Sequence, residues 1–284
     1  MGPGLFVRPR QLDLDGSPRH GMAWVAGPDQ WPTTRRSGRL VVPRGLAQLR
    51  HGDRDQLGEL AIPLQQPVRI GSLTLMALPS GVGPGCAQLQ LHVQQETWLV
   101  ASCSRPEPLP GAEPQVAGET ARVLVYCPPA TATSQLADLQ QWLQQLPLAV
   151  VQGGGIRLAQ PSAALAVAAI WPGPLRLSPA LRARLRGLPQ PAATSAPALR
   201  LGLLSEPLSH PVTAVLDPEW SPDDAGQSGL AFSVAAAGPA LVALCRLWSA
   251  EVLVAHGPGA TALAKEMAVG AVLVAAGQLP LPVA

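Results

Sequence analysis

The chain has 284 residues, enough to bury a full core as one large domain or as a core with a sizeable insertion. It carries 20 basic and 18 acidic side chains, and this near balance argues against a strongly electrostatic nucleic-acid-binding protein. Only 13% of the residues are charged and 47% are hydrophobic, so the composition also excludes an intrinsically disordered chain.

The first half of the chain is predicted to be rich in strands. Short segments with alternating or apolar character are separated by polar turns, which is typical of a series of hairpins. The predicted strands of this half are 12–15, 68–70, 73–78, 88–93, 97–101 and 123–126.

The second half is predicted to alternate helices with strands. Ser134 can cap a helix that ends at Pro147, and Ser178 followed by Pro179 can begin another. The Pro-rich segment 189–197 is predicted to be a surface linker. The other predicted elements are strands 149–152, 165–171, 199–204, 230–233, 252–256 and 271–275 and helices 239–248 and 260–267. This order suggests a layered αββα body that carries an α/β insertion.

No targeting or membrane segment is expected. The first ten residues lack a long apolar run behind a basic start, so a secretory signal is not predicted. The long uncharged stretches are interrupted by Pro or Gly, which favours buried strands and helices over a bilayer span. The cysteines show no CxxC spacing, which is typical of reduced core thiols in a cytoplasmic protein; they are Cys86, Cys103, Cys127 and Cys245.

Few residues could carry chemistry. The histidines are far apart and none has metal-ligand spacing; they are His20, His51, His92, His210 and His256. His256 ends a predicted strand and precedes Gly257, where a sheet delivers side chains to a crevice. It can be either a hydrogen-bonded structural residue or a ligand.

Arginines gather in two segments, 35–39 and 182–186. A solvated surface is one interpretation, and a patch that contacts phosphates is the other. The candidate nucleic-acid contacts are Arg35, Arg36, Arg182 and Arg186.

The order of several segments resembles the β-CASP metallo-β-lactamase-fold nucleases, and more narrowly the bacterial ligase-associated DNA exonucleases. In that branch a strand pair leads into a Pro-Ala-Gly-His-x-x-Gly-Ser-Ala-Gln segment, which residues 68–89 resemble. The other matching segments, in order, are Leu-Asp-Leu-Asp at 12–15, the turn at 22–31, Trp-Leu-Val-Ala-Ser-Cys-Ser-Arg at 98–105, 123–129, 232–239 and 252–257. The resemblance covers nearly the whole chain through this order and spacing.

The resemblance implies a four-layer αββα metallo-β-lactamase-like fold with a β-CASP-like α/β insertion. The body would comprise residues 1–129 and 212–284, and the insertion residues 130–211. In the family, the insertion clamps nucleic acid over two metal ions, usually zinc, that activate a water for attack on a phosphodiester.

The family's metal ligands are almost all missing from this chain. The first histidine cluster falls on 26–31, or one residue earlier, and offers only Asp29. The histidine of the glycine-rich segment is Val82, the bridging aspartate falls on Cys103 or Ser104, and the next acidic residue is Tyr126. The late Ser-Asp-His-Ala-Asp segment is Ser-Val-Ala-Ala-Ala at 233–237. Only Asp15, a structural position in the family, and His256, its final histidine ligand, match.

One aspartate and one histidine cannot hold two divalent ions, because several anionic or imidazole ligands must offset dehydration and mutual repulsion. We therefore expect no catalytic residues and no metal, with Asp15, Asp29, Cys103 and His256 as remnant positions. The expected function is a non-catalytic scaffold or binding module in DNA repair or RNA processing. Its expected partners are DNA, RNA, an active nuclease or a DNA ligase.

Two alternatives stay open at this point. Cys103, Cys127 and His256 could meet and hold one zinc with Asp29, which would make the protein a remodelled hydrolase or exonuclease with a mononuclear site. The chain could also be a structural relic that folds without a binding function.

Overall fold

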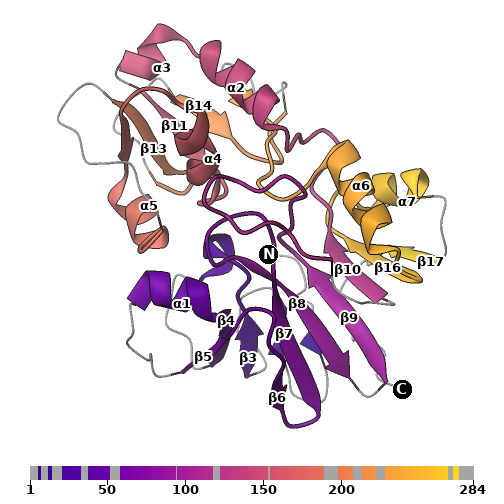
Figure 1. Cartoon of the computed structure of the whole chain (residues 1–284). Helices are drawn as coiled ribbons and strands as arrows, with labels where there is room; N and C mark the ends of the chain where they lie inside the picture. The colour runs from indigo at the N-terminus through magenta and orange to yellow at the C-terminus, as the bar shows by residue number, and fades with distance from the viewer. Residues whose placement is uncertain are drawn as a thin grey trace.

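The computed structural model describes residues 6–7, 12–14, 21–32, 38–51, 58–93, 95–117, 122–152, 154–188, 198–206, 213–221, 228–267 and 271–274. Figure 1 shows three groups of elements: two neighbouring sheets with flanking helices, and a separate group that contains α2 to α5. The predicted α/β class is confirmed.

The first sheet comes from the start of the chain. Its strands, in spatial order, are β1 (Phe6–Val7), β2 (Leu12–Asp13), β3 (Met22–Trp24), β4 (Arg39–Pro43) and β5 (Glu59–Ile62). Strands β2 to β5 run parallel. The short helix η1 (Pro28–Gln30) follows β3, and α1 (Arg44–His51) follows β4.

The second sheet is larger and combines hairpins with parallel strands. Its order is β17 (Ala271–Val274), β16 (Val252–His256), β10 (Arg122–Tyr126), β9 (Glu96–Ala101), β8 (Ala87–Val93), β7 (Leu73–Pro79) and β6 (Val68–Ile70). Strands β6 to β9 pair antiparallel, and β9, β10, β16 and β17 pair parallel.

The two sheets pack face to face, and each has helices on its other face. Alternating side chains of the first sheet, such as Trp24 and Val41, share a buried cluster with Leu75 and Leu89 of the second sheet. Helices α6 (Gly238–Trp248) and α7 (Ala260–Glu266) bury their apolar stripes on the opposite face of the second sheet. The other face of the first sheet packs with Leu46 of α1 in a different cluster.

The third sheet lies between β10 and α6 in the chain and is parallel throughout. Its order is β12 (Leu175–Leu177), β13 (Leu199–Leu203), β11 (Gly155–Leu158), β14 (Thr213–Leu216) and β15 (Ser228–Leu230). The helices of this part are α2 (Leu136–Gln144), α3 (Leu148–Gln152), α4 (Ala163–Ile170) and α5 (Pro179–Arg184). The sheet takes in β14 and β15, which the predicted insertion boundary at residue 211 leaves out.

Two predicted strands are helices. Residues 149–152 belong to α3 and 165–171 coincide largely with α4. Both segments are continuous apolar runs, and such a run does not by itself distinguish a buried helix from a buried strand. The high alanine content of α4 favours the helix. The predicted linker 189–197 lies outside the described residues.

No helix among the described residues is both long enough and apolar enough to cross a membrane.

Candidate functional site

The loops that the sequence resemblance aligns with metal-ligand segments lie at one edge of the second sheet. Strands β9, β10 and β16 run parallel, and β7 has the same direction because it is two antiparallel steps from β9. The carboxyl ends of all four strands therefore meet at the same edge. The residues delivered there include 80–86 after β7, 102–105 after β9, Cys127 after β10 and His256 at the end of β16.

Apolar side chains fill this edge. Val82 is fully buried and Val234 is 1% exposed, and both belong to a cluster with Cys86 and Leu109. The same cluster includes alanines of α4, so the third sheet's unit closes over the edge. Valine and alanine offer no lone pair to a metal, and this packing leaves the ligand positions dry.

Arg105 is a buried cation at the same place. Its residue is 2% exposed, its Nε donates to the Glu107 carbonyl at 2.7 Å, and its Nη1 donates to the Val234 carbonyl at 3.2 Å. The backbone N–H of Arg105 donates to the Ser80 carbonyl at 2.8 Å. Burial lowers the pKa of Arg105 and the charge of Glu107 raises it. A guanidinium remains charged in proteins, so the edge already holds a positive charge.

Neutral polar groups join the loops around Arg105. Ser104 Oγ donates to Gln88 Oε1 at 2.9 Å, and the N–H of Ala236 donates to the Ser104 carbonyl at 2.8 Å. Gln160 accepts from the Val234 N–H at 3.0 Å. These bonds fix the 233–237 segment against the loop after β9, although the buried Ser233 hydroxyl in that segment has no hydrogen-bond partner among the described residues.

Asp29 is directed to the third sheet's unit. Its carboxylate accepts from the Ser162 N–H at 2.7 Å and from Ser162 Oγ, directly before α4. Burial raises the pKa of Asp29, and the bonds from Ser162 and the charge of Arg184 act in the opposite direction. Asp29 therefore serves as a contact between two parts of the chain.

The cysteines and His256 do not assemble into a zinc site. Within the residues that the structure describes, no group of three or more His, Cys, Asp or Glu side chains is arranged to hold a metal ion. Cys103 lies near Cys86 and Asp29, and burial raises its thiol pKa well above the usual value. The alternative zinc site of Cys103, Cys127 and His256 with Asp29 is thus not formed, and the described residues at this edge do not fit a mononuclear or dinuclear metal centre.

His256 and Cys127 form a separate group at the end of β10 and β16. The Cys127 N–H donates to the His256 carbonyl at 2.7 Å, and the Tyr126 ring meets the His256 ring edge-on at 5.4 Å. Burial lowers the pKa of His256 to about 4 and raises the pKa of Cys127 to about 12. Both side chains are therefore neutral near pH 7.

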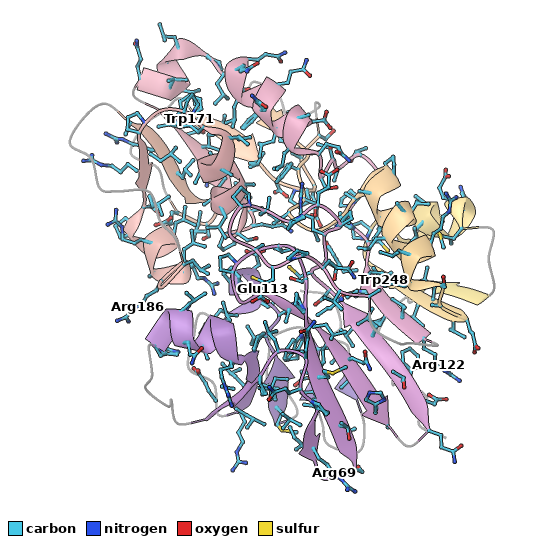
Figure 2. The ribbon with its side chains drawn as sticks, in the orientation of Figure 1. Arg69, Glu113, Arg122, Trp171, Arg186 and Trp248 are labelled. Atoms are coloured by element: carbon cyan, nitrogen blue, oxygen red, sulfur yellow. The ribbon has the colours of Figure 1, made fainter. Side chains whose placement is uncertain are left out.

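Some of the remaining predicted site residues lie within the described part of the chain and others do not. Asp15, Arg35 and Arg36 lie outside the described residues. Arg182 and Arg186 are exposed on and just after α5, and Figure 2 shows Arg186 at the periphery beside α1.

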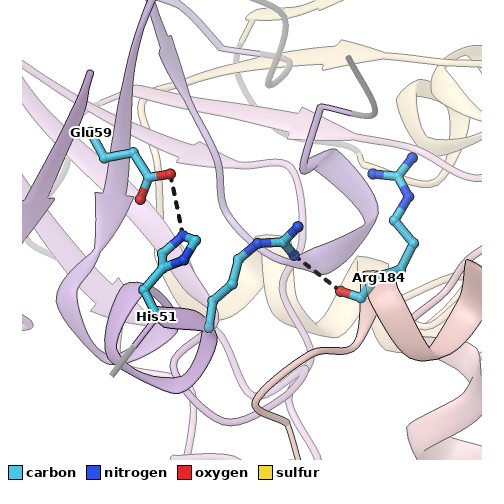
Figure 3. A network of polar contacts seen from close by, with 4 residues as sticks. His51, Glu59 and Arg184 are labelled. Atoms are coloured by element: carbon cyan, nitrogen blue, oxygen red, sulfur yellow. Dashed lines mark hydrogen bonds and ion pairs between the residues drawn. The ribbon is translucent and has the colours of Figure 1, made fainter. Parts of the chain in front are cut away.

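Arg184, between Arg182 and Arg186, donates from Nη1 to the Trp31 carbonyl. Arg50 of α1 lies 4.2 Å from the centre of the Trp31 ring and donates to the Arg184 carbonyl at 3.4 Å. His51 contacts Glu59 at 3.3 Å on the other side of this junction (Figure 3).

An open pocket of about 420 Å³ adjoins Asp29 at the carboxyl edge of the third sheet. Its walls come from the loops after β11 and β13, and Asp29 and Arg184 are its charged residues. The lining residues are Asp29, Leu158, Ala159, Pro161, Arg184, Leu203, Leu204 and Ser205.

No protein-family model matches the chain, and no curated protein matches it. Its fold is similar to the crystal structure of a protein of unknown function from Enterococcus faecalis V583, with a TM-score of 0.51 and 9% sequence identity. The match covers 84% of this chain and 75% of that chain. At this identity the likeness concerns the fold alone.

Arg105 is not among the residues that the sequence predicts for this site. The available signal was an arginine that follows an apolar strand and a Ser-Cys-Ser segment, where a solvated cation is the usual expectation. Its partner at Val234 is 129 residues away, so the burial could not be inferred from local sequence.

Proposed function

We propose that this protein is a catalytically degenerate relative of metal-dependent β-CASP nucleases that acts as a non-catalytic scaffold. It would hold DNA or RNA, or an active nuclease or DNA ligase, during DNA repair or RNA processing. The observation that carries the proposal is the buried Arg105 guanidinium among aliphatic side chains at the edge where metal ions would have to lie.

The electrostatics of that edge support the proposal. Two divalent ions need several anionic or imidazole ligands to offset their dehydration, and Val82 and Val234 provide none. A divalent ion beside Arg105 would also meet a like charge in a region of low dielectric, where repulsion is strong. The edge is suited to being packed and closed.

The arrangement of elements also supports it. Helix, sheet, sheet and helix follow one another as a four-layer αββα body requires, and a parallel α/β unit enters the chain after β10. A β-CASP-like insertion is expected to have such a composition. The extent of that unit, to β15, is larger than the predicted 130–211.

A scaffold must keep a surface for its partner. The exposed Arg182 and Arg186 can meet phosphates, and the pocket beside Asp29 and Arg184 lies at the junction between the body and the third sheet's unit. These features provide contact without a group that activates water.

The test combines binding and cleavage on the same labelled substrates. Purified protein is incubated with single- and double-stranded DNA and RNA in the presence of magnesium, manganese or zinc. We expect salt-dependent retention of a nucleic acid without product, and weaker retention in Arg182→Ala/Arg186→Ala. Metal-dependent cleavage that disappears in His256→Ala would overturn the proposal.

A stable complex with an active nuclease or ligase would support the protein-partner form of the proposal. Co-purification with each enzyme, analysed in parallel, separates this form from direct nucleic-acid retention. Failure of both measurements would favour the structural relic.

A further inference from the structure

Helix α6 is apolar on nearly all sides, but the described residues of this chain cover it on only one. Its eleven residues, 238–248, include a single charged residue, Arg246. The side that faces the second sheet is buried; its members are Leu241, Leu244, Cys245 and Trp248, of which Trp248 is labelled in Figure 2. A helix with such a composition is normally covered all round.

A second stripe lies on the outward side of α6. Pro239, Val242, Ala243 and Arg246 follow helical spacing and therefore share one face. Of these, Pro239, Ala243 and Arg246 are exposed and Val242 is half-buried. Leu247 is four residues after Ala243, which extends the stripe by one turn, and it is 58% exposed.

A groove of about 450 Å³ runs between this stripe and α7. Its floor is made of small and aliphatic residues of both helices, including Val242, Ala243, Ala262 and Leu263. Arg246 on α6 and Glu266 on α7 are its charged members, and both are exposed. Among the ion pairs of the described residues, none joins these two side chains.

The face thus combines complementary features on a single surface. Leu247 protrudes beside a groove that can receive an aliphatic side chain, and the same groove has one positive and one negative residue. A surface with both members of each pair is self-complementary under a two-fold axis, because each feature then meets its counterpart on the other copy. A foreign partner would require only one member of each pair.

We propose that the α6–α7 face binds a second copy of this chain in a two-fold homodimer. Leu247 of each copy enters the groove of the other, and Arg246 of each copy lies opposite Glu266 of the other. The contact covers the outward stripe of α6 and gives Arg246 and Glu266 the ion-pair partners that they lack among the described residues of one chain. The proposal is independent of whether the protein holds nucleic acid.

The first test measures molar mass by light scattering and sedimentation over a concentration series. We expect the wild type to reach twice the chain mass with rising concentration, and Leu247→Glu to raise the dissociation constant at least tenfold, about 1.4 kcal/mol. The control is Leu148→Glu on α3, which is 66% exposed and lies far from α6 in Figure 1. It should leave dimerisation unchanged, and circular dichroism checks that each variant is folded.

Charge exchange makes the test specific for a self-complementary contact. Arg246→Glu and Glu266→Arg should each weaken the dimer, because like charges then face one another across the axis. Combining both should restore it, since opposite charges meet again. A wild type that stays monomeric at every concentration, an equal loss in Leu148→Glu, or a double variant weaker than both single variants would overturn the proposal.

Discussion

At the scale of single residues, the carboxyl edge of the second sheet is defined by the side chains at the positions that the resemblance aligns with metal ligands. The sequence alone predicts that these positions carry no metal-binding side chain, because Val82 and the alanines at 235–237 are aliphatic. It does not predict Arg105 as a buried cation, since its carbonyl partners at Glu107 and Val234 are brought together only by the fold. It treats Asp29 as a remnant position, or as a zinc ligand in one alternative, whereas in the folded chain its carboxylate accepts from Ser162.

The burial of Arg105 leads to a stability prediction. Arg105→Ala leaves the Glu107 and Val234 carbonyls without their donor and opens a cavity, so the free energy of unfolding should fall by about 2 to 3 kcal/mol. The control is Arg69→Ala at the exposed β6–β7 hairpin, which should change it by less than about 0.5 kcal/mol. Urea unfolding of both variants provides the comparison, and equal effects would contradict the structural role of Arg105.

The raised pKa of Asp29 predicts a pH-dependent difference from Asp29→Asn. Below the unfolded value near 3.8 the carboxyl is protonated in both states, and it adds no pH dependence. As the pH rises toward the higher folded pKa, the unfolded state releases its proton first, and the wild type loses stability relative to the variant. Asparagine can still accept from the Ser162 N–H through Oδ1 and can donate from Nδ2 to Ser162 Oγ, so the difference reports mainly the loss of the charge.

Unfolding curves of wild type and Asp29→Asn from pH 4 to pH 7 measure this difference. We expect the stability of the variant relative to wild type to increase with pH over this range. A variant that is the less stable protein at pH 7, with a gap that widens with pH, would show that the ionised carboxylate stabilises the fold.

At the scale of elements, capping and periodicity are informative, and uniform apolar runs are not. The Ser178-Pro179 signal is confirmed, since α5 begins at Pro179 and Ser178 Oγ accepts from the Leu181 N–H at 3.1 Å. The apolar stripe after Ser134 also becomes α2, but the predicted cap is wrong: the N-cap is Gln135, without a side-chain cap bond, and Ser134 Oγ accepts instead from the Ala237 N–H at 3.1 Å. Helices α3 and α4 were expected as strands because neither has a polar face that would reveal a helical period.

The approach of α5 to α1 depends on Gly187. This residue has φ +84°, and a Cβ there would overlap the Leu49 carbonyl of α1. Gly187→Ala must therefore move backbone as well as adopt a strained conformation, and we expect a loss of about 2 kcal/mol or more in unfolding free energy.

Gly173→Ala is the matched control for Gly187→Ala. Its added Cβ would meet only the Trp171 side chain, which can move, and its φ is not in the left-handed region. The midpoint of thermal unfolding should therefore be clearly lower for Gly187→Ala than for Gly173→Ala. Equal stability of the two variants would show that α1 and α5 can move apart without a loss of unfolding free energy.

At the scale of the whole molecule, the sequence predicts an α/β body interrupted by an α/β unit. It predicts the first and last residues of that unit less accurately. Local patterns identify most strands of the second sheet because its hairpins join neighbouring segments. The third sheet has β11 at its centre, between β13 and β14, and this pairing is not encoded locally. The short strands β14 and β15 carry little periodicity, so the predicted boundary at 211 excludes them.

The packing of the third sheet's unit on the body explains why the edge of the second sheet is closed. Val82 and Val234 share a cluster with the helices of the third sheet's unit, and Asp29 reaches Ser162 from the first sheet's side. The same packing contacts thus fill the edge of the second sheet and hold the third sheet's unit against the body. In a nuclease the corresponding space would have to remain open to metal ions and substrate.

The most direct test counts the metal ions bound per chain. Protein is produced in medium supplemented with zinc and manganese, purified without chelators, and analysed by elemental mass spectrometry beside His256→Ala. We predict far less than one ion per chain in both proteins, with no difference between them. One or two ions per wild-type chain, lost in His256→Ala, would contradict the proposal that this edge of the second sheet holds Arg105 and aliphatic side chains in place of a metal centre.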